Sequence, residues 1–559
     1  MTPDVRLPTA EHRESGEIMT TADAAIATLV ANGIDKVYAL PGLHNDHLFD
    51  AMYKVRTRLQ VIHPRHEQTA GYMAVGAALS TGKPQVCAVV PGPGLLNCAS
   101  ALLTAEGVCA PVLALVGQIP QRDIDRNYGH LHEVRDQLGM ARHFTKYAER
   151  INAPFKACAV VNAAFEEMLS DRPGPAVIEC AMDVWPRAGV VPPIAGPASR
   201  RSHPIDSDAI RQAATILAAA RNPMIVVGAG ALDASREVEA VADLLEAPVL
   251  SYRRGRGVIS TDHRLAINLP IGHRLWSKTD VVLAIGTRLF IQEQQWGVDR
   301  DLKVVRIDAD PEAGERFAKP AVNLVGDAAI YLRGVISALP DRRARYRDEV
   351  NDELQRQRRW FAEQWQRLEP QASFVRALRR ALPENGIFVD EVTQVGFASR
   401  LAFPVYRPRT FLSPGYQDSL GWGYGTALGA KAANPDTPVL SIAGDGGFLY
   451  QLGELATAVH HKLAVVVVVF DNDMYGNVKL IQEQRFGQRI IGAELSNPDF
   501  VTLAEAFGIA AFRAETAAEL ERAVQDALAL NAPALVHVPC GPMPSPWPML
   551  LMPRVRGLH

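Results

Sequence analysis

Two loops in the last third of the chain carry oxygen-bearing side chains directly after apolar runs. Residues 439–442 lead into Gly444-Asp445-Gly446-Gly447, and residues 465–470 lead into Asp471-Asn472. Glycines at a strand-to-helix turn let backbone N–H groups approach phosphate, and Asp445 and Asn472 would offer Mg²⁺ the hard oxygens that it prefers. A lone Gly-Asp-Gly is most often an ordinary turn. Here, however, positions 444 and 472 are 28 residues apart, enough for one crossover helix and the next parallel strand, so both loops should meet at one sheet edge.

The pattern of the rest of the chain predicts the parallel sheets that such loops require. Short β-branched runs alternate with Ala-rich helical stretches, which is typical of strands joined by crossover helices. A Pro/Ser-rich stretch at 190–203 and a charged, helical stretch at 341–367 interrupt the alternation. We therefore predict an α/β fold with three doubly wound parallel-sheet domains, at 19–190, 204–340 and 370–545. The proline-dense apolar end, 544–559, should lie as an arm over a neighbouring surface.

Composition and charge exclude several classes of protein. The 559 residues include 58 Lys and Arg against 61 Asp and Glu, a net charge of −3, so a small molecule and not nucleic acid is the expected partner. The six cysteines form no C-x-x-C pair, which fits a reducing compartment, and we expect a cytoplasmic protein. The first 18 residues lack the apolar core of a signal peptide and should fray. The longest apolar run, 463–470, is far shorter than the roughly 20 residues of a membrane span, so no membrane association is expected.

Together, the two loops resemble the diphosphate and Mg²⁺ motif of thiamin-diphosphate (ThDP) enzymes, which runs from G-D-G to N-N. Asp471 stands where that family has its first asparagine, whereas Asn472 keeps the second position. The resemblance implies that Mg²⁺ is bound by the side chains of Asp445 and Asn472 and by the backbone carbonyl of Met474.

Three segments of the first block extend this resemblance. Arg65-His66-Glu67-Gln68 is similar to the family's R-H-E-Q, whose glutamate bonds to N1′ of the pyrimidine and favours the imino tautomer that can remove the C2 proton. Taken alone, Glu67 would be interpreted as a helix-start residue stabilised by the helix dipole. Pro91-Gly92-Pro93-Gly94 with Asn97 resembles the family's S-G-P-G-x-x-N turn. Gly117-Gln118-Ile119-Pro120 resembles the G-Q-V-P of acetolactate synthases.

Because these motifs lie far apart in the sequence, the chain is identified as a member of the acetolactate synthase-like ThDP enzymes over nearly its whole length. Its three blocks would then be a pyrimidine-binding, a central and a diphosphate-binding domain, and Leu420 would hold the cofactor in its V shape. The resemblance also implies a homodimer or homotetramer, because two chains share each cofactor in the family. The residues that it implies in ThDP binding are Pro41, Gly42, Glu67, Gly92, Val395, Gly396, Leu420, Gly444, Asp445, Gly446, Gly447, Asn472, Met474, Tyr475 and Gly476.

The central block departs from acetolactate synthases. Where these enzymes carry G-A-R-F-D-D-R, this chain has Gly286-Thr287-Arg288-Leu289-Phe290-Ile291-Gln292, so the Asp-Arg part that helps hold the acceptor 2-oxo acid is absent. A neutral residue cannot form the bidentate pair of an arginine with a carboxylate, so a second 2-oxo acid should bind poorly as acceptor. Ile481 also stands near the place of an expected tryptophan. Both differences argue against a biosynthetic acetolactate synthase.

Two histidines follow the first predicted strand of the first block, in Gly42-Leu43-His44-Asn45-Asp46-His47. The segment resembles benzaldehyde lyase, and a similarly spaced pair occurs in cyclohexane-1,2-dione hydrolase. An imidazole that titrates near neutral pH could relay a hydroxyl proton when a C–C bond beside a carbonyl forms or breaks. The alternative is that one histidine caps a helix and the other is solvated. The residues implied in substrate chemistry beside Glu67 are His47, the better candidate of the pair, His44, Gln118, His132 and Tyr416.

One further cofactor and the direction of the reaction stay open at this point. Gly228-Ala229-Gly230, with Arg256 and Asp308, could hold FAD or ADP, although a lone G-x-G is more often a tight turn without a nucleotide. The expected activity is that of a ThDP- and Mg²⁺-dependent lyase or carboligase acting on 2-oxo acids or 2-hydroxy ketones. A hydrolase of a cyclic 1,2-dione is the alternative within the family. A nucleotide-dependent dehydrogenase and a non-catalytic cofactor-binding protein are the alternatives outside it.

Overall fold

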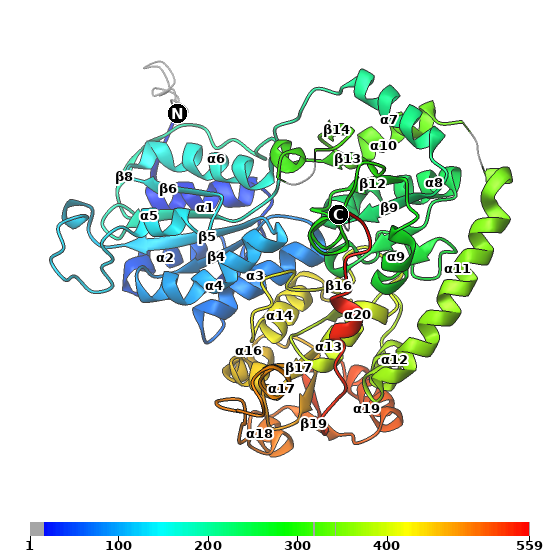
Figure 1. Ribbon diagram of the computed structural model, residues 1–559. Helices are drawn as coiled ribbons and strands as arrows, with labels where there is room; N and C mark the ends of the chain where they lie inside the picture. Colours follow the sequence, from blue (N-terminus) through cyan, green and yellow to red (C-terminus); the bar gives the residue numbers. More distant parts are fainter. Residues whose placement is uncertain (1–15, 317–318, 341–342, 558–559) are drawn as a thin grey trace. The chain divides into compact units, whose positions relative to one another are not determined.

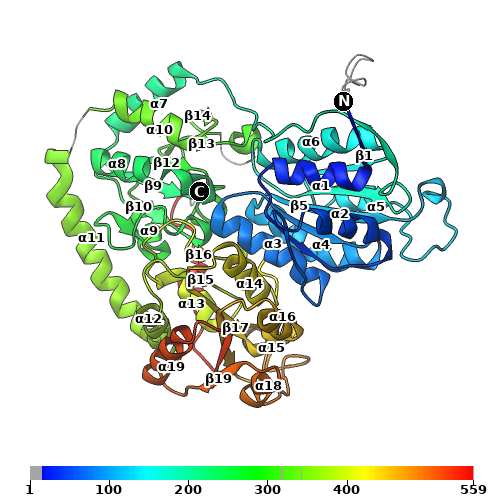
Figure 2. The ribbon, with the colours of Figure 1, turned by 180° about the vertical axis from the view of Figure 1, so that it is seen from behind.

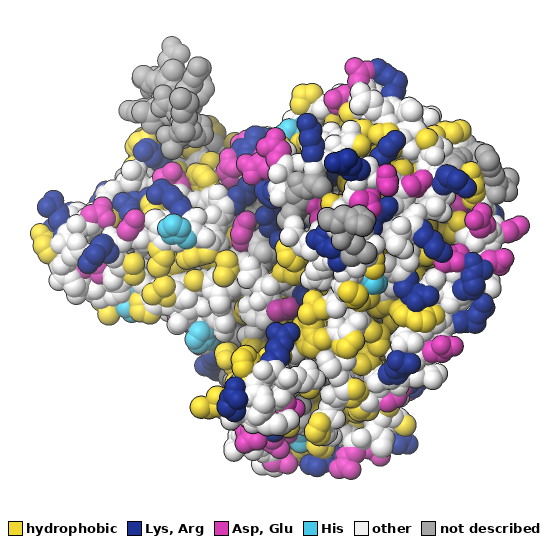
Figure 3. All heavy atoms as spheres, viewed as in Figure 1, with side chains coloured by type: hydrophobic (Ala, Val, Ile, Leu, Met, Phe, Trp, Pro, Cys, Tyr) yellow, Lys and Arg dark blue, Asp and Glu magenta, His cyan; other side chains and the backbone are white. Residues whose placement is uncertain are grey.

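The computed structural model describes residues 16–316, 319–340 and 343–557, which form two compact units that divide between Arg201 and Ser202 (Figure 1). Residues 1–15 of the start that was predicted to fray, and 558–559 of the apolar end, lie outside the described residues. In the described part of the chain, no helix is both long and apolar enough to cross a lipid bilayer. On the face drawn in Figure 3, acidic and basic side chains are interspersed, in keeping with the small net charge.

Unit 1 is built on a six-stranded parallel sheet with the strand order β3-β2-β4-β5-β7-β6. Its strands are β2 (Lys36–Ala39), β3 (Gln60–Ile62), β4 (Gln85–Val89), β5 (Val112–Gln118), β6 (Tyr147–Ile151) and β7 (Ala176–Ala181). Helices α1 (Thr21–Ala31) and α6 (Ala157–Leu169) cover one face, and α3 (Glu67–Thr81) and α4 (Pro93–Val108) cover the other (Figures 1 and 2). Because both faces are covered, the central strand β5 is apolar along almost its whole length and all seven of its residues are buried. Unit 1 also contains α2 (Asp46–Lys54), α5 (Gln137–Arg142) and the antiparallel pair β1 (Glu17–Thr20) and β8 (Ala188–Val191). The prediction that the first 18 residues fray is therefore wrong for Glu17 and Ile18, because they pair with Val191 and Val190.

Unit 2 contains two further sheets, and the first has the order β11-β10-β9-β12-β13-β14. Its strands, all parallel, are β9 (Pro223–Val227), β10 (Val249–Ser251), β11 (Ala266–Ile267), β12 (Val281–Ile285), β13 (Lys303–Asp308) and β14 (Val322–Val325). The helices around it are α7 (Ser207–Ala219), α8 (Ser235–Leu245), α9 (Leu269–Trp276) and α10 (Ala328–Ala338). The charged stretch that follows forms the long helix α11 (Arg343–Trp365), so the predicted helical connector is confirmed.

The second sheet of unit 2 has the order β16-β15-β17-β18-β20-β19 and is also parallel throughout. Its strands are β15 (Ile387–Val389), β16 (Phe411–Leu412), β17 (Val439–Gly444), β18 (Val465–Asp471), β19 (Ala510–Arg513) and β20 (Ala534–Pro539). Its helices are α12 (Gln371–Ala381), α13 (Gln394–Ala402), α14 (Gly423–Ala433), α15 (Asp445–Leu449), α16 (Leu455–His460), α17 (Gly476–Arg485), α18 (Phe500–Ala506) and α19 (Ala517–Ala529). The predicted fold class, three parallel-sheet α/β domains, is therefore confirmed.

The proline-dense end of the chain lies over the surface of unit 2, as predicted for an arm. The ring of Trp547 packs 5.0 Å from that of Phe397 in α13, and the backbone N–H groups of Val555 and Arg556 both donate to the carbonyl of Trp296. The arm includes one helical turn, α20 (Trp547–Leu550), which the prediction did not foresee. Proline is tolerated there because the first N–H groups of a helix have no intrahelical partner.

Candidate functional site

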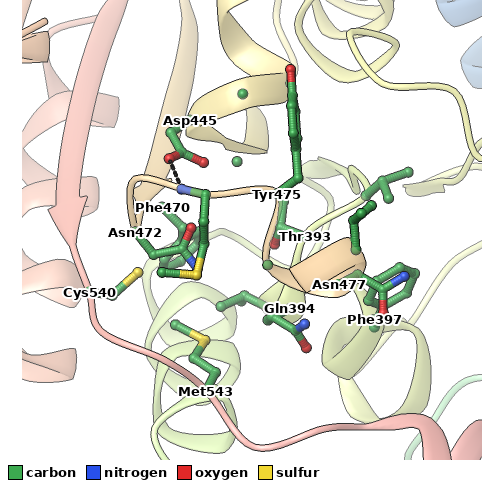
Figure 4. A pocket seen from close by; sticks show the side chains of 18 of the residues that line it. Thr393, Gln394, Phe397, Asp445, Phe470, Asn472, Tyr475, Asn477, Cys540 and Met543 are labelled. Atoms are coloured by element: carbon green, nitrogen blue, oxygen red, sulfur yellow. Dashed lines mark hydrogen bonds between the residues drawn. The ribbon is translucent and has the colours of Figure 1, made fainter. Parts of the chain in front are cut away.

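A cavity of about 210 Å³ opens at the carboxyl edge of the second sheet of unit 2 (Figure 4). Its wall contains residues 392–395 after β15, residues 444–447 at the end of β17 and residues 474–478 after β18. The strand order reverses between β15 and β17, and at such a reversal the loops separate and leave a crevice for a ligand. Because β17 pairs with β18 in parallel, the prediction that the two polar loops meet at one sheet edge is confirmed.

The turn after β17 needs its glycines because another loop passes close to it. Gly444 is the N-cap of α15 and no side chain caps this helix start. A Cβ on Gly446 would lie 2.5 Å from the ring of Tyr475, which is closer than non-bonded atoms approach. The backbone of this turn therefore lies against the loop after β18. The start of α15 beside the cavity has no side-chain cap, so its backbone N–H groups could bind an anion.

The carboxylate of Asp445 lies at the centre of this arrangement and is only 3% exposed. Its Oδ2 accepts hydrogen bonds from the backbone N–H of Met474, at 3.3 Å, and from the side chain of Asn497, at 2.8 Å (Figure 4 draws the first). Burial raises the pKa of Asp445 above its usual range and the nearby carboxylate of Asp471 raises it further, while hydrogen bonds from Gly446 and Asn497 act in the opposite direction. A divalent cation among these oxygens would relieve the repulsion, and Asn472 lines the same cavity.

Asn497 is a contact of this site that sequence reasoning missed. Its amide nitrogen lies 2.8 Å from Oδ1 of Asp471 and 3.2 Å from Oδ1 of Asp473, in addition to its bond to Asp445. The other oxygen of Asp471 lies 2.9 Å from Nε2 of His537 on β20. Asp471, which replaces the first asparagine of the family motif, is thus held from two sides. No local signal marks Asn497, because it lies in an irregular segment 25 positions after Asn472.

Most of the other predicted residues of unit 2 also line the cavity. Val395, Leu420, Gly447, Tyr475 and Gly476 are in its wall, together with Thr393 and Gln394, which were not predicted. Gly396, which was also predicted to bind the cofactor, is not among the described residues that line the cavity. A Cβ on Gly396 would lie 1.9 Å from the carbonyl oxygen of Glu391, so this glycine is required by the packing of the start of α13.

The predicted residues of unit 1 also collect at one carboxyl sheet edge. Pro41 and Gly42 follow β2, Gly92 follows β4, and Gln118 ends β5, with the strand order reversing between β2 and β4. Gly92 has a φ of +58°, and a Cβ there would lie 2.4 Å from the carbonyl oxygen of His132. Only glycine meets both conditions, which explains the glycine of this turn.

A buried polar network fixes this edge. Glu179 on β7 accepts hydrogen bonds from the side chains of Gln137, at 2.9 Å, and Gln118, at 3.3 Å, and it forms an ion pair with Arg150. Gln137 also accepts a bond from the backbone N–H of Gly92, at 3.0 Å. Gln118 is 2% exposed, so its amide is held inside the unit. A glutamate within the apolar run of β7 is visible in the sequence, but its partners are not.

Glu67 is the first residue of α3, which confirms its predicted position at a helix start. The side chain of Asn97 on α4 donates to Oε2 of Glu67 at 3.0 Å. A Cβ on Gly94 would lie 3.7 Å from Oε1, an ordinary contact, so the glycine turn after β4 passes directly beside the carboxylate. The Glu67 segment and the turn after β4, which the sequence paired only by resemblance, are therefore neighbours in space.

The structure brings His44 together with His132 but leaves His47 apart from them. The rings of His44 and His132 stack with centroids 5.2 Å apart, and Nε2 of His44 lies 3.1 Å from the carbonyl oxygen of Leu131. Burial lowers the pKa of His44, and the neighbouring His132 lowers it further. His47 lies on the exposed surface of α2. Of the three predicted histidines, the two that lie together are thus His44, which is buried, and His132, which is half-buried.

Tyr416 lies in unit 2, on the loop that leads to Leu420, and 44% of it is exposed. Desolvation raises the pKa of its phenol to about 12, although the nearby guanidinium of Arg253 acts in the opposite direction. The phenol is therefore protonated at neutral pH and can donate a hydrogen bond.

The glycine turn after β9 does not fit the phosphate of a flavin or adenine nucleotide. The N–H groups of Gly228 and Gly230 donate to the carbonyl oxygens of Ile285 and Gly286. A Cβ on Gly228 would lie 2.2 Å from the Gly286 oxygen, so the two turns are in direct backbone contact. Arg256 is also engaged, because its guanidinium donates to backbone carbonyls at the end of α13 and just beyond it. The N–H groups of both glycines and the guanidinium of Arg256 are thus bonded to backbone carbonyls, which argues against FAD or ADP at this turn.

Comparison with known proteins agrees with this architecture. Family profiles of thiamine pyrophosphate enzymes match the chain in three places: the N-terminal TPP binding domain at residues 19–140, the central domain at 210–335 and the C-terminal TPP binding domain at 391–538. A probable 2-ketoarginine decarboxylase of Pseudomonas aeruginosa is 31% identical over 530 residues, which cover 93% of this chain and 94% of that protein. A probable acetolactate synthase large subunit of Methanocaldococcus jannaschii is 31% identical over 566 residues, 94% of this chain and 92% of that protein. The large subunit of acetolactate synthase isozyme 3 of Escherichia coli is 28% identical over 537 residues, 92% of both chains.

Proposed function

The chain belongs to the thiamine pyrophosphate enzymes, and we propose that it is a ThDP- and Mg²⁺-dependent lyase or carboligase that acts on 2-oxo acids or 2-hydroxy ketones. The observation that carries the proposal is the cavity at the strand-order reversal, where Asp445, Asn472 and Met474 share one wall with the uncapped start of α15. The relatives are named for decarboxylating a 2-oxo acid and for making acetolactate, which favours a 2-oxo acid as the donor.

The residues of this cavity suit a metal bound to a diphosphate. Asp445 and Asn472 would bind Mg²⁺ through side-chain oxygens and Met474 through its backbone carbonyl, and the N–H groups at the start of α15 would bind the diphosphate. Asn497 and His537 hold Asp471 and so keep the loop of Asn472 in place. Leu420 would contact the thiazolium ring from the cavity wall.

In unit 1, the proposed role of Glu67 is to hold a proton at N1′ of the pyrimidine. The hydrogen bond from Asn97 fixes the direction of its carboxylate, and the stacked His44 and His132 would move the proton of the substrate hydroxyl. Since the pKa of His44 is lowered, its imidazole is neutral at pH 7 and can accept a proton. When bound, ThDP supplies a carbon nucleophile at C2 for the substrate carbonyl.

A proton NMR time course with ThDP, Mg²⁺ and pyruvate, with and without an added aldehyde, tests the proposed reaction. We expect pyruvate to disappear and acetolactate or another acyloin to accumulate. If pyruvate persists, added acyloins should be cleaved to aldehydes. A protein that changes neither class of compound is not the enzyme that we propose.

The role of Glu67 is tested by Glu67→Gln. This variant should still bind ThDP, measured by quenching of tryptophan fluorescence, but it should lose hydrogen–deuterium exchange at C2 of the bound cofactor. Glu149→Gln, which changes an exposed glutamate of the same unit, is the control and should behave as the unmodified protein. Exchange that persists in Glu67→Gln would refute the assignment.

Light scattering coupled to size exclusion tests the homodimer or homotetramer that also forms part of the proposal.

A further inference from the structure

Three side chains of unit 2 lie around the ring of Tyr416: those of Arg253, Arg288 and Phe290. We call these four residues the Tyr416 cluster. The guanidinium carbons of Arg253 and Arg288 lie 4.6 and 5.2 Å from the centre of the Tyr416 ring. The ring of Phe290 meets that of Tyr416 edge-on, with centroids 5.3 Å apart. Tyr416 is 44% exposed and Phe290 39% exposed, so two aromatic rings and a guanidinium group face solvent together.

The charges of the cluster do not balance. Arg253 forms a two-pronged bond with Asp418, with distances of 3.1 to 3.2 Å. The same Asp418 also lies 2.8 Å from Arg400, whose other partner is Asp390. Arg288 is exposed, and among the described residues no carboxylate oxygen lies within 4 Å of its guanidinium. Arg253 and Arg400 therefore share Asp418 and Asp390, and the positive charge of Arg288 is in excess.

The cluster is tied to the cofactor cavity by a short piece of chain. Tyr416 precedes Leu420 by four residues, and Leu420 is part of the cavity wall. Four residues span at most about 14 Å even when fully extended. The loop from Tyr416 to Leu420 therefore connects the cluster to the cavity wall within unit 2.

We infer that the Tyr416 cluster binds a carboxylate at the far end of the substrate, with Arg288 as the partner of the carboxylate and the two aromatic rings as the support of the carbon chain. Arginine matches a carboxylate with two parallel N–H···O bonds, and the rings offer apolar surface beside it. A cationic substrate end would meet the unbalanced positive charge of Arg288 and be repelled. The inference rests on the proposed function and narrows its substrate class to 2-oxo acids that carry a second, distal carboxylate.

The kinetic test compares substrates that differ only at the far end. Decarboxylation by the ThDP- and Mg²⁺-loaded protein is measured with 2-oxoglutarate, 2-oxobutanoate and 2-ketoarginine. We expect 2-oxoglutarate to have the highest kcat/KM of the three. Arg288→Gln should lower the ratio of kcat/KM for 2-oxoglutarate to that for 2-oxobutanoate about 10- to 100-fold, as expected for the loss of hydrogen bonds to a charged group. Arg288→Lys should recover part of this ratio, and Arg236→Gln, an exposed arginine on α8, should leave it unchanged. A ratio that does not move in Arg288→Gln, or a preference for 2-ketoarginine, would overturn the inference.

A binding test separates this inference from the proposed reaction. Glutarate, a dicarboxylate without a keto group, should bind the loaded protein in calorimetry, and Arg288→Gln should weaken that binding about 10-fold or more. If glutarate binds in this way but no 2-oxo acid is consumed, the carboxylate site stands and the proposed reaction fails. If 2-oxobutanoate is consumed but glutarate binding does not depend on Arg288, the reaction stands and the carboxylate site fails. Displacement of glutarate by ADP or FAD at lower concentration would show a phosphate site in its place and overturn the inference.

Discussion

The replacement of Glu179 by alanine should destabilise unit 1 and loosen the glycine turn after β4. The carboxylate is fully buried and holds Arg150, Gln118 and Gln137 together. Removal of one partner from a buried ion pair costs about 3–5 kcal/mol because the remaining charge stays unpaired, and the side chain of Arg150, 27% exposed, recovers only part of this through water. Each 1.4 kcal/mol of lost unfolding free energy corresponds to about a factor of ten in the population of the open state. Hydrogen exchange of buried amides in unit 1 should therefore accelerate about 10²- to 10³-fold.

Hydrogen-exchange mass spectrometry on the full chain measures this effect in peptides that cover 85–95 and 112–118. Glu179→Gln should also accelerate exchange, because its amide group would face N–H donors on one side. Glu149→Ala removes an exposed glutamate on the adjacent strand β6 and is the matched control. If both Glu179 variants exchange within threefold of the unmodified protein, Glu179 does not hold this edge and the reasoning from its buried bonds is wrong.

Three further predictions concern single groups. Burial raises the pKa of Glu391 to about 8, whereas an unfolded glutamate titrates near 4.3. Between these two pH values the folded protein retains a proton that the unfolded chain releases. The free energy of unfolding should therefore fall as pH rises from about 4 to 8. Scanning calorimetry at several pH values should show that Glu391→Gln removes this part of the pH dependence. Asn97→Ala should slow C2 exchange of bound ThDP about fivefold, since one hydrogen bond to the partly exposed Glu67 is worth about 1 kcal/mol. Asn497→Ala should weaken Mg²⁺-dependent ThDP binding about 3- to 10-fold in fluorescence titrations, because Asp445 loses a donor that fixes its direction.

Each of these predictions has an outcome that contradicts it. A difference in melting temperature between Glu391→Gln and the unmodified protein that stays constant from pH 5 to 8 would show that Glu391 does not retain its proton. Equal exchange rates in Asn97→Ala would mean that the carboxylate of Glu67 needs no support from α4. Unchanged Mg²⁺ titrations in Asn497→Ala would mean that the backbone N–H groups of Gly446 and Met474 suffice to direct Asp445.

The predicted elements that were confirmed share a strong local cause. The strand at 465–470 is a continuous apolar run, and the strand at 439–442 is apolar except for Ser441. Such runs form the buried strands of a parallel sheet. Strand ends that are 28 residues apart leave room for one right-handed crossover helix and little else. The meeting of Asp445 and Asn472 at one sheet edge was therefore predictable. The one helical turn in the apolar end was not, because its stability comes from packing of Trp547 on α13 and not from its own sequence.

The family, the three parallel sheets and the polar loops at their carboxyl edges can be predicted from the sequence, because strand patterns and glycine turns are local properties of the backbone. The side chains that complete these edges become visible in the folded chain. Asn497 reaches Asp445 across 52 positions, Gln137 reaches Gly92 across 45, and His44 stacks on His132 and not beside His47. Contacts of this kind depend on how loops close over a sheet, and a single sequence carries no periodic signal for them.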